Sequence, residues 1–118
     1  MVQVATKMID ETPAAIDRSH LARMTFNDRS LEREVLQLFD RQATLLIGRM
    51  RASDAAVVGS LAHTLKGSAT GIGAGRVARA AEAAENAAAS SDCSQAIDRL
   101  AQAVDEARAL IAELLRAG

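Results

Sequence analysis

The 118-residue sequence contains almost no aromatic residues, with two Phe and neither Trp nor Tyr. Stacking on nucleic-acid bases or on sugar rings is therefore not expected. The single cysteine, Cys93, excludes a disulfide within the chain and a zinc site built from cysteines. A formal net charge of −1 provides no basic footprint for nucleic acid or for an anionic membrane, so we expect neither as a partner.

Long apolar runs and targeting signals are missing as well. The first fifteen residues, MVQVATKMIDETPAA, have no sustained apolar region, and a run such as AAVVGSLA is much shorter than the ~20 residues that a membrane span needs. We expect a cytoplasmic protein, because the lone cysteine fits a reducing compartment. The Met start and the polar ends are the features that favour a free-standing protein, and the alternative of a phospho-accepting module of a larger sensor kinase stays open.

Helix-forming residues dominate what is present. Alanine is abundant, the one proline is Pro13, and runs of alternating β-branched residues are absent, which predicts an all-α fold. We expect a flexible lead-in over residues 1–15 and one domain over residues 16–118. Its pattern is typical of an antiparallel up-down four-helix bundle with a short additional N-terminal helix. The expected helices span about 17–24, 28–52, 54–70 and 74–89, and a last helix follows a capping box at Asp92 and Gln95.

Apolar spacing predicts which side chains form the core. In the first helix these are Leu21 and Met24. In the second helix they are Leu31, Val35, Leu38, Phe39, Leu45, Leu46 and Met50. The fourth helix contributes Val77, Ala81, Ala84 and Ala88, and the last contributes Ile97, Leu100, Val104, Ala107, Ile111 and Leu114. The glycines of the stretch GIGAG are expected to end the third helix near Thr70.

The third helix has one apolar face and one unusual opposite face. Val58, Leu61, Ala62, Leu65 and Ala69 cluster on a helical wheel, and Ile72 continues their stripe. His63 lies about 140° from the centre of that stripe and should point away from the core. Its side of the helix is shared by Gly59, Ser60, Lys66, Gly67 and Thr70. Glycine within a helix costs about 0.5–1 kcal/mol relative to alanine, so small residues beside His63 indicate a surface that another protein approaches closely.

Histidine and lysine in this arrangement favour phosphoryl chemistry. Free imidazole is largely neutral near pH 7, and its lone pair is a competent nucleophile toward phosphorus. Lys66 lies one turn away, where its ammonium can steady the added negative charge. The sequence contains no Walker loop and no carboxylate trio for Mg²⁺. We therefore expect a carrier of phosphoryl groups, not an enzyme, with no cofactor or metal bound by this chain.

The segment His63-Thr64-Leu65-Lys66-Gly67, followed by Gly73-Ala74, resembles the H-x-L-K-G signature and the Gly-Ala pair of histidine-containing phosphotransfer (HPt) domains. The resemblance extends over about residues 16–115, and Glu85 falls at an acidic position that the family often has in its next helix. Gly71 and Gly75 depart from the pattern, because the family more often keeps helix formers there.

The resemblance implies a phosphorelay function. His63 would accept a phosphoryl group from a receiver-domain aspartate or a sensor (hybrid) histidine kinase, and would pass it to another response-regulator receiver domain. Lys66 would be the cation next to the phosphate and Gly67 the clearance residue. From their place on the helical wheel, we expect Gly59, Ser60 and Thr70 to line the surface that binds the partner. The Mg²⁺ would belong to the receiver. We expect a monomer.

Other interpretations of the same residues stay open. The alternative function is a non-phosphorylated helical adaptor that docks receiver domains through the same face. His20 has no lysine or glycine context and is interpreted as structural or solvent-facing. Glu82 and Glu85 are interpreted as surface charges, because no partner group is evident from the sequence. Arg76 and Arg79 are interpreted as solvated charges, with contact to an acidic receiver surface as the alternative.

Overall fold

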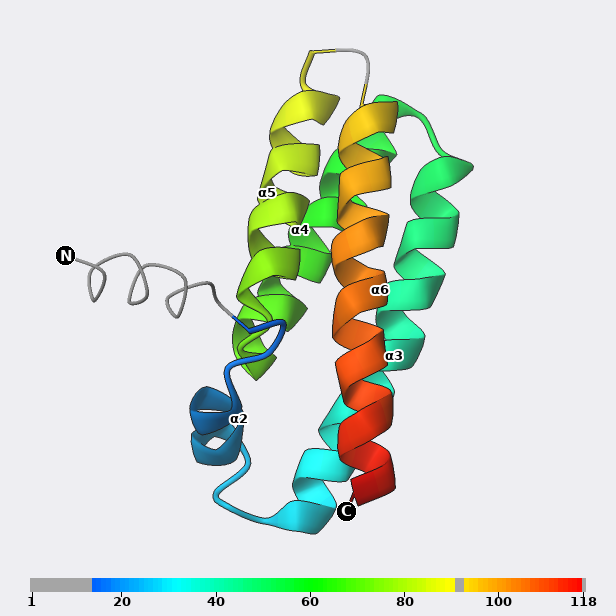
Figure 1. The fold of residues 1–118 in the computed structure, drawn as a ribbon. Coiled ribbons are helices and arrows are strands. Elements are labelled where there is room, and N and C mark those ends of the chain that lie inside the picture. The colour runs from blue at the N-terminus through cyan, green and yellow to red at the C-terminus, as the bar shows by residue number, and fades with distance from the viewer. Residues whose placement is uncertain (1–13, 91–92, 118) are drawn as a thin grey trace, which may run out of the picture.

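The computed structural model describes residues 14–90 and 93–117, in which five helices are joined by short connections and there is no strand (Figure 1). The all-α prediction is confirmed. The described helices are α2 (Arg18–Met24), α3 (Arg29–Arg51), α4 (Ala55–Ile72), α5 (Gly75–Ala88) and α6 (Ser94–Ala117). Of the expected lead-in over residues 1–15, all but the last two residues lie outside the described residues, and so does Asp92 of the expected capping box.

Aspartate side chains begin the first three of these helices. The carboxylate of Asp17 accepts a hydrogen bond from the backbone N–H of His20 at 3.1 Å, and that of Asp54 accepts from Val57 at 3.1 Å. Asp28 accepts from the N–H groups of both Ser30 and Leu31. Each carboxylate satisfies amide donors that have no partner within the helix, which contributes about 1 kcal/mol per cap. The predicted starts near residues 28 and 54 are therefore confirmed.

The end of α4 is set by one glycine of the GIGAG stretch. Gly73 has a φ of 82°, in the left-handed region, whereas Gly71 lies within α4 and Gly75 begins α5. The N–H of Ala74 donates to the carbonyl of Ala69 at 2.8 Å, and that of Gly73 donates to Thr70 at 3.2 Å. These bonds are typical of a Schellman motif. The prediction that α4 ends near Thr70 was two residues short, because the helix continues to the position that needs a positive φ.

We expect Gly73→Ala and Gly71→Ala to change stability in opposite directions. A Cβ at Gly73 would lie 3.0 Å from the Asp17 carbonyl oxygen and 3.2 Å from His20 Cδ2, in a backbone conformation that costs an L-residue about 1–2 kcal/mol. A Cβ at Gly71 meets nothing within 4 Å, so Gly71→Ala should stabilise the helix by about 0.5–1 kcal/mol. Urea denaturation measures both values, and a loss of stability in Gly71→Ala would contradict this account.

The four long helices pack side by side (Figure 1). α3 contacts α4 and α6, and α5 contacts the same two helices from the other side. Small residues bring α4 and α5 together, because Ala62 and Ala69 on α4 and Ala81 and Ala84 on α5 are all 0% exposed. This close approach matters for the site, since it places the outer edge of α5 beside the outer face of α4. No described helix has the length and apolar character needed to cross a bilayer.

The short helix α2 is fixed to the end of α4. Ile16 and Leu21 are each 1% exposed, and the N–H of Asp17 donates to the carbonyl of Gly73 at 2.9 Å. His20 Nε2 lies 3.1 Å from the carbonyl oxygen of Gly71, which can only accept, so Nε2 carries the hydrogen. His20 therefore satisfies a carbonyl that α4 leaves free at its C-terminus, as its structural interpretation predicted.

The apolar faces of α4, α5 and α6 agree with the sequence prediction, but that of α3 differs. The buried side chains of α3 are Leu36, Phe39, Ala43, Leu46 and Met50. Leu38 and Leu45 are 57% and 55% exposed, and Met24 of α2 is 50% exposed, so their assignment to the core was wrong. Two stripes of apolar residues run along α3, offset by one residue or about 100°, and only one of them is buried in the core.

Charged residues of α3 reach across to α6. Arg108 Nε lies 2.6 Å from Asp40 Oδ1, and Arg51 Nη1 lies 2.9 Å from Asp98 Oδ1. These pairs are partly solvated and each contributes at most about 1 kcal/mol. They fix the side of α3 that faces α6, which leaves the opposite side, next to α4, for the second apolar stripe.

Candidate functional site

His63 stands on the outer face of α4. Val58, Ala62 and Leu65 of the same helix are at most 1% exposed and face the core, and Leu61 is half-buried at its edge. The side chain of His63 is 67% exposed. The prediction that the imidazole points away from the core is confirmed.

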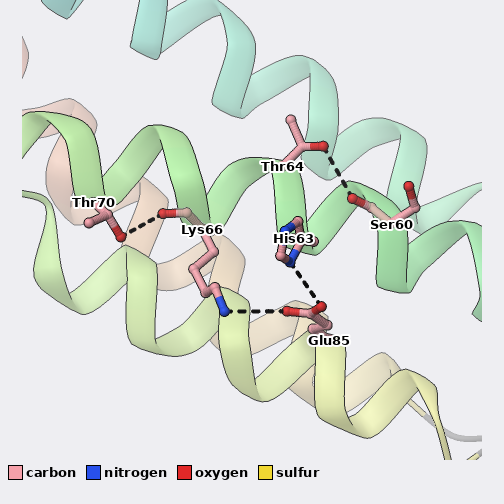
Figure 2. Close-up of polar contacts among 6 residues, drawn as sticks. All are labelled: Ser60, His63, Thr64, Lys66, Thr70 and Glu85. Carbon is pink, nitrogen blue, oxygen red and sulfur yellow. Dashed lines mark hydrogen bonds and ion pairs between the residues drawn. The ribbon is translucent and has the colours of Figure 1, made fainter.

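A carboxylate from the neighbouring helix holds the imidazole (Figure 2). Glu85 Oε2 on α5 lies 3.0 Å from His63 Nδ1, and the other carboxylate oxygen, Oε1, lies 3.7 Å from Lys66 Nζ. Both Glu85 and Lys66 are about one-third exposed at the side chain, compared with two-thirds for His63. The three groups form a compact cluster, with the carboxylate between the ring and the ammonium.

The geometry selects one tautomer of the ring. An ionised carboxylate can only accept, so Nδ1 of His63 carries the hydrogen and donates it to Glu85. The nitrogen on the opposite side of a neutral imidazole then has its lone pair free. Within the described residues Nε2 has no hydrogen-bond partner. A solvent-facing nitrogen lone pair beside a lysine suits nucleophilic attack on an approaching electrophile.

Comparison with known protein families identifies the family of this chain. The model of the Hpt domain matches residues 29–110, which is most of the chain and includes α3, α4, α5 and the greater part of α6. This chain belongs to the Hpt domain family. Hpt domains are phosphotransfer carriers of two-component phosphorelays, and they are not enzymes in general. Comparison with curated proteins and with solved structures gave no match.

The surroundings of His63 in this Hpt domain are small and open. Gly67, one turn along α4, is exposed, and a Cβ placed on it would meet nothing within 4 Å. Ser60 and Thr70 are exposed on the same side. The Thr70 hydroxyl donates to the carbonyl of Lys66 at 2.8 Å, and the Thr64 hydroxyl donates to that of Ser60 at 3.2 Å (Figure 2). Hydrogen bonds of this kind hold the threonine hydroxyls against their own helix, which leaves the space around the His63 imidazole open.

Gly59 does not share the open surface. It is half-buried, and a Cβ on it would lie 3.6 Å from the Cβ of Ala88 on α5. The placement of Gly59 beside Gly67 on an open face was wrong, because the wheel of one helix does not show where the next helix packs. Gly59 lies where α4 and α5 pack together, the contact that also positions Glu85, and an added Cβ would make an ordinary van der Waals contact there.

Glu85 is the site residue that the charge pattern missed. It was interpreted as a surface charge without a partner, but it contacts both His63 and Lys66. Spacing along one helix could not reveal the contact, because it depends on how α4 and α5 pack. The acidic position of the family pattern was the one signal that pointed to it. Arg76 differs from its interpretation as a solvated charge, because it pairs with Glu106 on α6 at 3.0 Å.

Proposed function

We propose that this Hpt domain, an antiparallel up-down four-helix bundle, carries a phosphoryl group on His63 between partners of a phosphorelay. The donor is the phospho-aspartate of a receiver domain or a sensor histidine kinase, and the acceptor is the aspartate of another receiver domain. The observation that supports this most strongly is the His63–Glu85 contact, which leaves Nε2 with a free lone pair on an open surface.

The transfer step balances without moving a proton. The Nε2 lone pair of His63 attacks phosphorus, the N–P bond forms, and the P–O bond to the receiver's aspartate breaks as its carboxylate leaves. The ring becomes a phosphorylated imidazolium that keeps its hydrogen on Nδ1, where Glu85 stabilises the positive charge. In the reverse step the leaving group is then a neutral imidazole, which departs more readily than an anion would.

Lys66 supplies the charge that the phosphoryl group needs. Its ammonium lies 3.7 Å from Glu85 in this structure, too long for a strong hydrogen bond, and its side chain is flexible. We propose that it turns toward the phosphoryl oxygens when His63 is modified. In this scheme Mg²⁺ belongs to the receiver's acidic pocket, and this chain provides the acceptor atom and the clearance around it.

The test is phosphoryl transfer from purified receivers of the source organism. Each receiver is phosphorylated on its aspartate with a radiolabelled small phosphodonor, freed of excess donor and incubated with this chain and Mg²⁺. We expect at least one receiver to label the chain with a phosphate that is labile in acid and stable in base, as phosphohistidine is. Failure of every receiver to transfer, together with tight binding by one of them, would support the adaptor alternative and overturn this proposal.

We expect Glu85→Gln to slow transfer without unfolding the chain. The amide can still accept from Nδ1, but it lacks the charge that stabilises the phosphorylated imidazolium. A hydrogen bond to a charged group contributes about 1.5–3 kcal/mol, and for this partly exposed pair the lower value corresponds to roughly a tenfold slower transfer. Glu82→Gln, on the exposed face of the same helix, is the matched control and should leave the rate unchanged.

We expect Gly67→Leu to block the partner without harming the fold. The new side chain would project into the space above α4 that a receiver must occupy, and we expect transfer to slow by at least about tenfold, which is about 1.4 kcal/mol of docking free energy. Gly48→Leu is the matched control, because a Cβ on this exposed glycine of α3 also meets nothing within 4 Å. A large fall in melting temperature with normal transfer in Gly67→Leu would contradict the clearance role.

A further inference from the structure

Most of the second stripe of α3 lies outside the core, although Val35 packs against the edge of the core. The stripe consists of Leu31, Val35, Leu38, Gln42 and Leu45, spaced by four, three, four and three residues, and each of the last four precedes a buried residue of the core stripe. Leu38 and Leu45 are more than half exposed, and Leu31 and Val35 are half-buried. Spacing of this kind is the pattern of a seam between two helices, with leucine at every d position of the heptad.

A groove accompanies the stripe. Between α3 and α4 lies a hollow of about 220 Å³, lined by Val35, Leu38, Phe39, Gln42, Ser68 and Ile72. Glu85 and α5 lie on the other flank of α4, where the His63 cluster is. The groove and the His63 cluster therefore lie on different flanks of α4, and Ser68 of the groove directly follows Gly67.

Opposite charges flank the stripe at a spacing of one heptad. Glu34 and Arg41 are both exposed and lie on the solvent side of the stripe, at the g positions of the heptad. Neither has an ion-pair partner among the residues that the structure describes. The e positions are Glu32, Phe39 and Leu46; Phe39 and Leu46 are buried in the core and Glu32 is half-buried, so next to Val35 and Leu38 only the g positions present exposed charges.

We propose that α3 pairs with α3 of a second copy of this chain in an antiparallel, two-fold symmetric arrangement. In antiparallel helix pairs an a position faces a d position, and g positions face g positions. One register sets Val35 against Leu38 of the second copy, with Leu38 against its Val35. The same register sets Glu34 against Arg41 of the second copy, and symmetry repeats the pair. The leucine of each copy then enters the other copy's groove beside Val35.

Charge selects this register and this partner. A shift by one heptad in one direction sets Glu34 against Glu34, and a shift in the other direction sets Arg41 against Arg41. A parallel pair would oppose Glu34 and Arg41 to the e positions of the next heptad, Phe39 and Leu46, which are apolar and buried, so the two charges would have no partners. Because Glu34 and Arg41 of one copy face Arg41 and Glu34 of the other, the stripe is complementary to an identical helix. The proposed dimer differs from the monomer expected from the sequence.

Sedimentation equilibrium on the full chain and on charge-reversed variants tests the pairing. We expect the wild type to dimerise as its concentration rises toward about 1 mM, a range that detects even a weak association. Glu34→Arg and Arg41→Glu should each be monomeric, because each sets like charges against each other. An equimolar mixture of the two should dimerise again, since every pair then has opposite signs, and the double variant E34R/R41E should dimerise by itself.

Two results would overturn the proposal. One is a wild-type chain that stays monomeric over the whole concentration range. If Leu38→Asp then also weakens receiver binding, the stripe is a surface for the receiver and not for a second copy. The other is a mixture of the single variants that associates no better than either alone. The proposal does not depend on phosphoryl transfer, and His63→Gln should dimerise as the wild type does.

Discussion

A His63→Gln variant is expected to fold as the wild type does and to accept no phosphoryl group from any receiver. Glutamine has no nucleophilic nitrogen, because the lone pair of its amide is delocalised into the carbonyl. The side chain at this position is two-thirds exposed and contributes nothing to the core, so the melting temperature should change little. Radiolabel transfer and thermal denaturation, measured on the same preparation, give the two readouts.

His20→Gln is the matched control for this loss. His20 is the other histidine of the chain, and its ring donates to the Gly71 carbonyl at the end of α4. We expect His20→Gln to keep full labelling and to lose some stability, which is the reverse of the pattern at His63. Acid-labile label that persists in His63→Gln would assign the chemistry to another residue.

The largest effect on stability is expected for Leu65→Ala. Leu65 lies two residues after His63 on α4, is 0% exposed, and faces the core. Removing its side-chain atoms leaves a cavity that a close-packed interior fills only in part, which costs about 2–5 kcal/mol. For a domain of this size that is a large share of the total of roughly 5–15 kcal/mol. Urea denaturation followed by circular dichroism measures the loss.

Leu45→Ala is the control for the same chemical change at the surface. Leu45 is 55% exposed on α3, so much of its side chain already contacts water. We expect the loss to be below about 1 kcal/mol. Equal losses at the two positions would mean that the described packing of α3 and α4 is wrong. In Leu65→Ala, transfer to the folded fraction should stay normal, because His63 and Glu85 keep their places on the surface.

The helices could be predicted from the sequence where a local rule decides them. Aspartate caps at Asp28 and Asp54 fixed two starts, and the stripe of α6 from Ile97 to Ile111 identified its buried face without ambiguity. The outward orientation of His63 followed from the same periodicity on α4. In each of these cases the deciding interaction lies within one helix, so the sequence contains it.

What the sequence could not provide depends on contacts between helices. α3 has two stripes of the same spacing, and only the polar Gln42 in the outer stripe distinguishes it from the buried one; Leu38 and Leu45 were therefore misplaced. Gly59 and Gly67 look alike on a helical wheel, but α5 covers one and leaves the other open. The position of Glu85 depends on alanines of two helices that meet, which no spacing along a single helix records.

The attachment of α2 determines how far a recombinant protein can be shortened. The segment shared with the family, residues 29–110, omits Ile16 and Leu21, and it also omits Leu115, whose carbonyl accepts from Arg33 at 2.7 Å. Trimming to the shared segment would uncover the apolar surface beneath Ile16 at one end and release that arginine at the other. Crystallisation or labelling of a minimal protein should therefore retain everything from Ile16 through Leu115, beyond the borders that family membership alone suggests.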